Sequence, residues 1–373
     1  MTNKIHPELL NTVRTLSASL VPCFLYANNY TQLLDELNKL NIIYQEFPFI
    51  NCFYANLTNR QIITLSKLSS INFITKSCKV STMLDKVKKF INLNTCSTDT
   101  LSSNITIAFI DTGISPHLDF LLPTNRILHF KDLINNHTYP YDDNGHGTFV
   151  CGVCASSGVC SNGKYSGITK NANIVMIKAL DKNGETTSNK ILEAMQYIYS
   201  IRKKYNIKIV CMSFGADYSG RNDPLQQGAL TLWNSGIVVV AAAGNSGPDK
   251  HTIKSPGTSS RIITVGGLDD GRNDGQIKIA DFSSRGPCEN KFKPDLVAPS
   301  VEITSTSNIS NHQLYTQMSG TSVATPIVAG ICALILKANP TFTPDKLKYT
   351  LLNNCTPITF NKNNEGYGYF KFE

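Results

Sequence analysis

The chain has 373 residues, of which 41% are hydrophobic and 17% are charged, and its formal net charge at pH 7 is +8. This length and apolar content can build a large hydrophobic core and are typical of two folded domains. No basic segment is interleaved with aromatic residues, so nucleic acid is not an expected partner and the lysine excess is assigned to a solvated surface.

The N-terminal residues and the cysteine content predict where in the cell the protein resides. Residues 1–8 lack the charged-then-apolar order of a secretion signal, and no segment is expected to have the apolar length of a membrane span. Eleven cysteines in such a chain favour a reducing compartment, with thiols rather than disulfides. We therefore expect a cytoplasmic monomer, with non-classical export or association with spores left open.

The first 80 residues predict a small α+β domain. Strand patterns at 20–26, 42–47, 51–55 and 71–80 and helical spacing at 30–40 and 59–68 follow one another in the order βαββαβ. This order is that of a ferredoxin-like split unit. Residues 81–104, which are rich in Lys, Thr, Ser and Asn, then predict a linker with one short helix over residues 84–91.

An unbroken apolar run follows at residues 105–110 and predicts a buried parallel strand. Asp111 lies where this strand ends, and Gly113 allows a tight turn. In open α/β sheets, the ligand crevice lies beyond the carboxyl ends of the strands. Taken alone, Asp111 would be interpreted as a helix N-cap or a turn aspartate.

His146 is flanked by Gly145 and Gly147 at a predicted helix start, so we expect its imidazole to be more exposed than most. Cys151 and Cys154 follow as a C-x-x-C pair. A metal or redox pair is one interpretation of them. No second pair lies nearby, and small buried side chains in a core helix are the favoured interpretation.

The remaining residues alternate between strands and helices. Strands are predicted at 174–179, 207–213, 237–243 and 262–265, and helices at 188–203 and 223–234. Such alternation predicts a parallel sheet with helices on both faces, so residues 105–373 form an α/β domain. Asn245 follows the small residues that end the strand at 237–243.

Ser322 lies in a run of small residues at 320–326, where a long apolar stretch at 323–336 begins. Small residues allow a sharp turn and a close approach of substrate, and a helix start points free N–H groups and a positive dipole end outward. We expect an exposed serine there. Turns of this kind also occur for packing alone.

Asp111, His146 and Ser322 are the residue types of a nucleophilic triad. Serine needs a base to take its proton, imidazole titrates near neutrality, and a buried carboxylate fixes the tautomer of the imidazole. Asn245 and the backbone N–H of Ser322 are the candidate donors to an oxyanion.

Four stretches, at 139–148, 241–249, 282–287 and 293–299, give the chain its family resemblance. Together with the triad order, they resemble the subtilisin-like serine proteases (subtilases, peptidase family S8), and within them the AprX-like bacterial branch. The resemblance implies a subtilisin-like catalytic domain over residues 105–373 and a serine endopeptidase that cleaves proteins through an acyl-enzyme.

The resemblance also gives roles to the first 104 residues. In subtilases, a domain of this topology assists folding and then inhibits the enzyme with its tail in the cleft, so residues 1–80 are expected to be a prodomain. Maturation is expected to cut within residues 81–104. An accessory or dimerisation domain is the alternative.

Substrate binding is also implied by the resemblance. An extended peptide is expected to add as a strand beside Ser213-Phe214-Gly215 and beside residues 241–244, where Ala242, Ala243 and Gly244 leave room for the P1 side chain. Lys254 is expected at the floor of the P1 pocket, where family members often have a small residue. Lys254 either favours acidic or polar P1 groups or shortens the pocket, or it extends into solvent.

The chemistry requires no cofactor or metal. The loop at residues 156–166 holds no acidic residue, so the tight calcium loop of the family is expected to be absent, with a weaker structural calcium elsewhere left open. A catalytically silent pseudoprotease that acts as a binding or signalling module is the alternative function. The intact triad disfavours it, whereas Phe149 and Val323 replace a frequent His and Met beside the triad.

Overall fold

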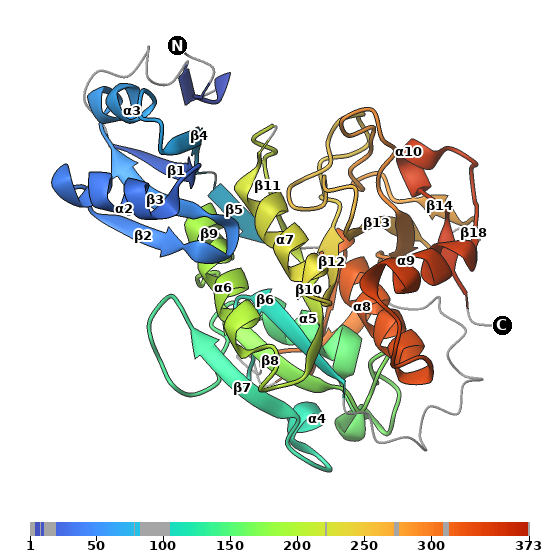
Figure 1. Ribbon diagram of the computed structural model, residues 1–373. Coiled ribbons are helices and arrows are strands. Elements are labelled where there is room, and N and C mark those ends of the chain that lie inside the picture. Colours follow the sequence, from blue (N-terminus) through green and yellow to red (C-terminus); the bar gives the residue numbers. More distant parts are fainter. Residues whose placement is uncertain are drawn as a thin grey trace.

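The computed structural model describes residues 4–7, 9–10, 20–77, 79–82, 105–220, 222–271, 276–308 and 313–371. The described residues form a small N-terminal unit beside a larger α/β unit (Figure 1). Most of the predicted linker, together with the short helix predicted at 84–91, lies outside the described residues.

The small unit has the predicted order of elements. They are β1 (Val21–Ala27), α2 (Tyr30–Lys39), β2 (Tyr44–Phe47), the 3-10 turn η1 (Pro48–Ile50), β3 (Cys52–Leu57), α3 (Asn59–Leu65) and β4 (Ile71–Lys76). The sheet order is β2-β3-β1-β4, with every neighbouring pair antiparallel. The ferredoxin-like prediction is therefore confirmed.

Strand β1 of the small unit is buried on both faces. Cys23 and Leu25 of β1 pack beneath its own helices, whereas Phe24 and Tyr26 join the hydrophobic core of the larger unit. Alternate side chains of a strand point to opposite faces, so a strand that is apolar at every position needs two partners. The second partner here is the larger unit.

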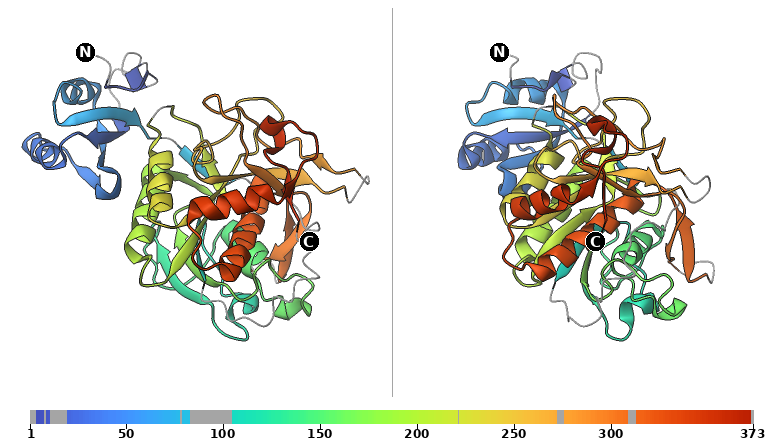
Figure 2. Two further views of the ribbon diagram at one scale, coloured as in Figure 1. Left: turned by 45° about the vertical axis from the view of Figure 1, so that its right-hand side comes forward. Right: turned by 90° about the vertical axis from the view of Figure 1, so that its right-hand side faces the viewer.

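Helices α6 (Ser188–Ile201) and α7 (Pro224–Asn234) supply the contacts with the small unit. The ring of Phe49, in η1, lies 6.3 Å from the ring of Tyr199 on α6. The side chain of Gln196 donates a hydrogen bond to the carbonyl oxygen of Glu46 at 3.4 Å. The small unit thus packs against these two helices through η1 and β2 (Figure 2).

The larger unit is built on one sheet with the order β18-β19-β15-β13-β12-β10-β6-β8-β7, and β14 pairs with β13. Its strands are β6 (Thr106–Asp111), β7 (Ile127–Asp132), β8 (Asn173–Lys178), β10 (Ile207–Met212), β12 (Val238–Ala242), β13 (Ile263–Asp269), β14 (Lys278–Ile279), β15 (Leu296–Pro299), β18 (Cys355–Thr356) and β19 (Tyr369–Phe370). From β15 to β7 all pairs are parallel.

Helices cover both faces of this sheet, as predicted. Helices α5 (His146–Ala155) and α8 (Thr321–Ala338) pack together on one face, and α6 and α7 pack together on the other. The smaller elements are α4 (Leu118–Leu121), η4 (Val159–Ser161), the hairpin β16 (Ile303–Thr306) with β17 (Tyr315–Met318), α9 (Pro344–Asn353) and α10 (Lys362–Glu365).

Helix α8 corrects one expectation, that no segment is apolar enough over the length of a membrane span. Its 18 residues have a mean hydropathy of 1.7 and pass that test by length and composition, and 78% of the helix is buried inside the protein. Helix α8 packs on β10, β12, β13 and β15. A core helix that is buried all round is expected to be apolar all round.

A three-stranded sheet joins the two units. Strand β5 (Lys79–Thr82), which follows the small unit, lies between β11 (Phe214–Ala216) and β9 (Glu185–Thr187) of the larger unit and is antiparallel to both. In this register, Thr82 is opposite Phe214, and Ser81 is opposite Gly215 on one side and Glu185 on the other. The chain therefore inserts its own strand between two edges of the larger unit.

Candidate active site

Asp111 and His146 meet at the carboxyl edge of the sheet. Asp111 is the last residue of β6, and His146 is the first residue of α5. The Nδ1 atom of His146 lies 2.7 Å from Oδ1 of Asp111, and both side chains are at most 1% exposed. A carboxylate accepts hydrogen bonds, so in the neutral imidazole Nδ1 carries the proton and Nε2 has the lone pair.

The Nε2 atom of His146 is buried and has no hydrogen-bond partner among the described residues. The expectation of an exposed imidazole is therefore wrong. Every residue of α5 is buried, because this helix packs against α8 and β16. A buried ring nitrogen with a free lone pair is placed to accept a proton from a neighbouring group.

The residue after His146 must be glycine, because there is no room for a side chain at that position. A Cβ on Gly147 would lie 2.2 Å from the carbonyl oxygen of Gly113 and 3.2 Å from Cβ of Asp111. The first turn of α5 thus approaches the end of β6 so closely that no side chain fits between them. The backbone N–H of Thr112 also donates to Oδ1 of Asp111 at 2.7 Å, which orients the carboxylate.

Ser322 is the second residue of α8 and is fully buried, so the expectation of an exposed serine is also wrong. No hydrogen bond joins its hydroxyl to Nε2 of His146 in this structure. Such hydrogen bonds are often long without substrate and tighten in the complex. The structure thus brings Asp111 and His146 into contact and places Ser322 at the N-terminus of the helix packed beside α5.

Asn245 contacts the residue just before Ser322. The N–H and the hydroxyl of Thr321 donate to Oδ1 of Asn245 at 2.9 and 3.0 Å, and Thr321 Oγ1 accepts from the N–H of Gly244 at 3.2 Å. With Oδ1 held in this way, the Nδ2 amide is turned away from Thr321. Within the described part of the chain this amide donates to no acceptor. It is therefore available to donate to a ligand.

The structure corrects the second predicted substrate edge. Ala241 and Ala242 pair with strands on both sides within the large sheet. The N–H and carbonyl of Ala243 bond to Val265 and Lys254, and those of Gly244 bond to Thr321 and Ser284. This backbone is fully used and cannot accept an added strand. The strand that lies opposite β11 across β5 is β9, a short run that ends in two threonines and that sequence patterns alone did not single out.

Lys254 lies between residues 243–244 and strand β11, the two segments predicted to bind substrate. Its backbone N–H donates to Ala243, and Ser255, which follows it, pairs with Ala216 of β11. Its stem lies against Gly244, where an added Cβ would be 2.6 Å from Lys254 Cγ. Its ammonium lies 2.6 Å from a carboxylate oxygen of Asp217, with exposed side-chain fractions of 26% and 86%.

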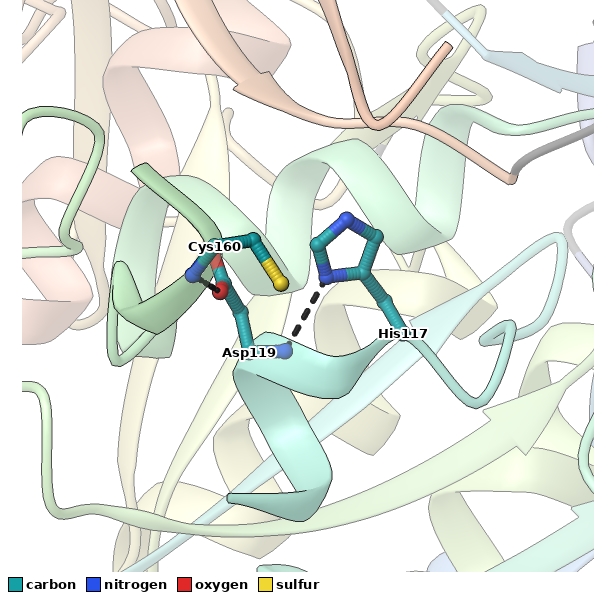
Figure 3. A group of neighbouring side chains, drawn as sticks. All are labelled: His117, Asp119 and Cys160. Carbon is teal, nitrogen blue, oxygen red and sulfur yellow. Dashed lines mark hydrogen bonds between the residues drawn. The ribbon is translucent and has the colours of Figure 1, made fainter. Parts of the chain in front are cut away.

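A second group of polar side chains lies on α4 and η4 (Figure 3). Ligand atoms of His117, Asp119 and Cys160 lie within 4.8 Å of one another. The His117 ring bonds to the carbonyl oxygen of Leu314 and the N–H of Asp119, and the Asp119 carboxylate accepts from Ser156, Tyr315 and the N–H of Cys160. Protein partners thus already occupy both imidazole nitrogens and both carboxylate oxygens.

Nine cysteines are free thiols in the described part of the chain. Cys151 and Cys154 lie in the interior of α5, fully buried, and burial raises the pKa of both thiols well above the usual range. Metal binding and disulfide exchange need a thiolate. Their interpretation as small core residues therefore fits the structure.

A buried Asp–His pair at the carboxyl edge of a parallel sheet, packed beside a helix that begins with a serine, is the arrangement of a subtilisin-like serine endopeptidase. The chain belongs to the subtilase family (peptidase S8), whose sequence model matches residues 102–369. Serine protease AprX of Bacillus subtilis (strain 168) is 39% identical over 343 residues, which are 85% of this chain and 77% of that protein. The resemblance to the AprX-like branch is confirmed.

Further relatives and solved structures are also subtilisins or resemble this chain in fold. Subtilisin DY of Bacillus licheniformis is 32% identical over 69% of this chain and 85% of its own length. Among solved structures, fervidolysin from Fervidobacterium pennivorans, a keratinolytic enzyme related to subtilisin, aligns with a TM-score of 0.74 over 95% of this chain and 60% of that chain at 20% identity. Sphericase aligns with a TM-score of 0.63 at 27% identity, covering 74% of this chain and 95% of that chain.

Proposed function

We propose that this chain hydrolyses peptide bonds in proteins through Asp111, His146 and Ser322. The observation that carries the proposal is the buried Asp111–His146 pair, whose Nε2 atom has no described partner. In the proposed reaction, Nε2 takes the proton of the Ser322 hydroxyl as its oxygen attacks the substrate carbonyl. Asp111 fixes the tautomer and stabilises the imidazolium that forms.

The oxyanion of the tetrahedral intermediate is assigned to the Nδ2 amide of Asn245 and the backbone N–H of Ser322. The contacts of Thr321 with Asn245 Oδ1 support this role, because they direct the amide before substrate arrives. The imidazolium then protonates the leaving amine, and water releases the acyl-enzyme by the same steps. No step requires a cofactor or a metal.

The small N-terminal unit is proposed to be an inhibitory prodomain. Strand β5 supports this role, because it occupies the position between β11 and β9 in which an extended substrate would pair. The contacts with α6 and α7 hold the rest of the unit in place. An accessory domain would not need to fill a pair of strand edges with its own tail.

Maturation is proposed to cut within residues 81–104, close behind Thr82. Because β5 is antiparallel to β11 with Thr82 opposite Phe214, the chain at Thr82 runs toward Ser213 at the carboxyl end of β10. That edge of the sheet also carries Asp111. Residues 83–104 lie outside the described residues. A mature N-terminus far from Thr82, found by N-terminal sequencing, would contradict this assignment.

Specificity at P1 is proposed to depend on Lys254. Its stem occupies the space beside Gly244 and its ammonium pairs with Asp217 just after β11, so that Lys254 connects Gly244 with the end of β11. This arrangement favours a shortened pocket with a polar floor. We also propose that the enzyme acts as a cytoplasmic monomer on protein substrates. The free thiols among the described residues support a reducing compartment.

The decisive experiment compares the wild type with Ser322→Ala. Both are incubated with casein and, separately, with a fluorophosphonate probe, and chain size is followed on a gel. We expect the wild type to process itself, to degrade casein and to bind the probe, and the variant to remain one intact chain. Equal degradation by both proteins would exclude Ser322 as the nucleophile, and an unlabelled and inactive wild type would favour the pseudoprotease.

A further inference from the structure

Asp142 is a buried carboxylate that carries no ion pair within the described part of the chain. Its Oδ1 atom accepts from the N–H groups of Asn144 and Gly145 at 3.1 and 2.8 Å. Its Oδ2 atom accepts from the N–H and the hydroxyl of Thr148 at 2.8 and 2.6 Å. Asp142 therefore neutralises the free N–H groups where α5 begins, next to His146.

A further hydrogen bond of Asp142 reaches the other half of the catalytic pair. The Thr112 hydroxyl donates to Asp142 Oδ1 at 2.9 Å and accepts from the N–H of Gly147 at 2.9 Å. The backbone N–H of Thr112 donates to Asp111 at 2.7 Å. The side chain of Thr112, the residue after the catalytic aspartate, thus bonds both Asp142 and Gly147, the residue after the catalytic histidine.

We propose that Asp142, acting through Thr112, is a positioning residue that holds His146 in register with Asp111. The inference rests on the proposed function. Two elements that are far apart in sequence meet at a 2.7 Å contact, and the Asp142–Thr112 link is a direct side-chain tie between them. Misplacing a catalytic group by about 1 Å can cost about 10²-fold in rate.

A buried lysine near Asp142 holds the backbone of Thr112 in place. The buried ammonium of Lys178 donates to the carbonyl oxygen of Thr112 and to Asp143, both at 2.6 Å, so it holds the backbone of Thr112 without contacting Asp142. The Asp142 carboxylate is left to the N–H groups of Asn144, Gly145 and Thr148 and to the two threonine hydroxyls. Both oxygens of Asp142 accept hydrogen bonds. An asparagine in its place would have only one acceptor oxygen and could not accept from both sets of donors.

Thr112→Val is the first test, since valine keeps the shape of threonine and removes only the hydroxyl. We expect its kcat to fall about 10- to 100-fold while KM stays within about twofold of the wild type. Thr112→Ser, which keeps the hydroxyl, should restore kcat to within about threefold. Active sites are counted by fluorophosphonate titration, so that a loss of folded protein is not mistaken for a loss of rate.

Asp142→Asn and Asp132→Asn form a matched pair. Asp132 is also fully buried and accepts from three N–H groups and a tyrosine hydroxyl, and none of these donors belongs to Thr112 or α5. Both changes should lower the unfolding temperature. Asp142→Asn should also lower kcat per active site at least tenfold, whereas Asp132→Asn should leave it within about twofold.

An active wild type with equal kcat in Thr112→Val and Thr112→Ser would overturn the positioning role alone. So would equal losses of kcat in the two aspartate variants. If Asp142→Asn does not fold, the comparison of the two threonine variants decides by itself. A wild type without any activity overturns the proposed function, and the positioning role with it.

Discussion

Lys293 gives a prediction about stability at alkaline pH. It is 1% exposed, and its ammonium lies 2.5 Å from Oδ2 of Asp295 and 2.7 Å from the Thr264 hydroxyl. Lys348 pairs with the other oxygen of Asp295 at 2.7 Å. Two buried or half-buried lysines thus share one carboxylate. Burial, together with repulsion from Lys348, lowers the pKa of Lys293 from 10.5 to about 7 despite the attraction of Asp295.

This lowered pKa makes stability rise with pH. Between about pH 7 and 10.5 the unfolded lysine keeps its proton while the folded one releases it, so the unfolded state binds more protons and stability increases with pH. Each pKa unit corresponds to about 1.4 kcal/mol, so the charged lysine destabilises the fold below pH 7 by at most about 5 kcal/mol. This destabilisation vanishes above the pKa that Lys293 has in the unfolded chain.

Replacing Lys293 with methionine removes the titrating group and keeps an unbranched side chain. Asp295 keeps Lys348 and the N–H of Thr264 as partners. The free energy of unfolding is measured in urea for Ser322→Ala with and without Lys293→Met, because the serine change prevents self-digestion. We expect the advantage of methionine to shrink by about 2–5 kcal/mol between about pH 6 and pH 10. A difference that is constant with pH would refute the reasoning.

Three further predictions follow from the site. Asn245→Ala should lower kcat about 10²- to 10³-fold with little change in KM on a peptide substrate, and a loss below about tenfold would exclude Asn245 from the oxyanion hole. Lys254→Ala should change stability by less than about 1 kcal/mol, because its ion pair is largely exposed, and should shift P1 preference toward larger apolar groups, because it lengthens the pocket and removes its polar floor. An unaltered P1-scanning library would exclude that role. The thiols of Cys151 and Cys154 should escape iodoacetamide in the folded protein and react after unfolding, because burial raises their pKa, as peptide mass mapping can show.

Most elements of the fold were predictable from local patterns. The apolar runs at β8, β10 and β12 are buried on both faces, and such strands need no tertiary information to be recognised. Strand β13 runs to Asp269, four residues beyond its predicted end, because Gly266 and Gly267 interrupt the apolar pattern but pair with β15. Glycine is a poor strand signal whose use depends on the neighbouring strand.

The candidate site was predictable only in part. Asp111 ends a buried apolar strand, whereas His146, Asn245 and Ser322 lie among glycines and other small residues, because close approach of backbones excludes larger side chains there. Asp142 carries no such signal: an aspartate ahead of a turn is common, and its role depends on Thr112, which lies 30 residues away. The pairing of β9 with β5 was missed for the same reason, since a single short strand becomes an edge only when its partner is present.

The sequence by itself determined the kinds of elements, their order and the residue types at the ends of the strands, because these depend on local periodicity and on the space near each backbone. Only the tertiary structure decided which side chains meet, that His146 and Ser322 are buried, and that β5 of the same chain pairs with β11 and β9. These outcomes depend on the packing of segments far apart in the chain, and no local pattern encodes a distance between them.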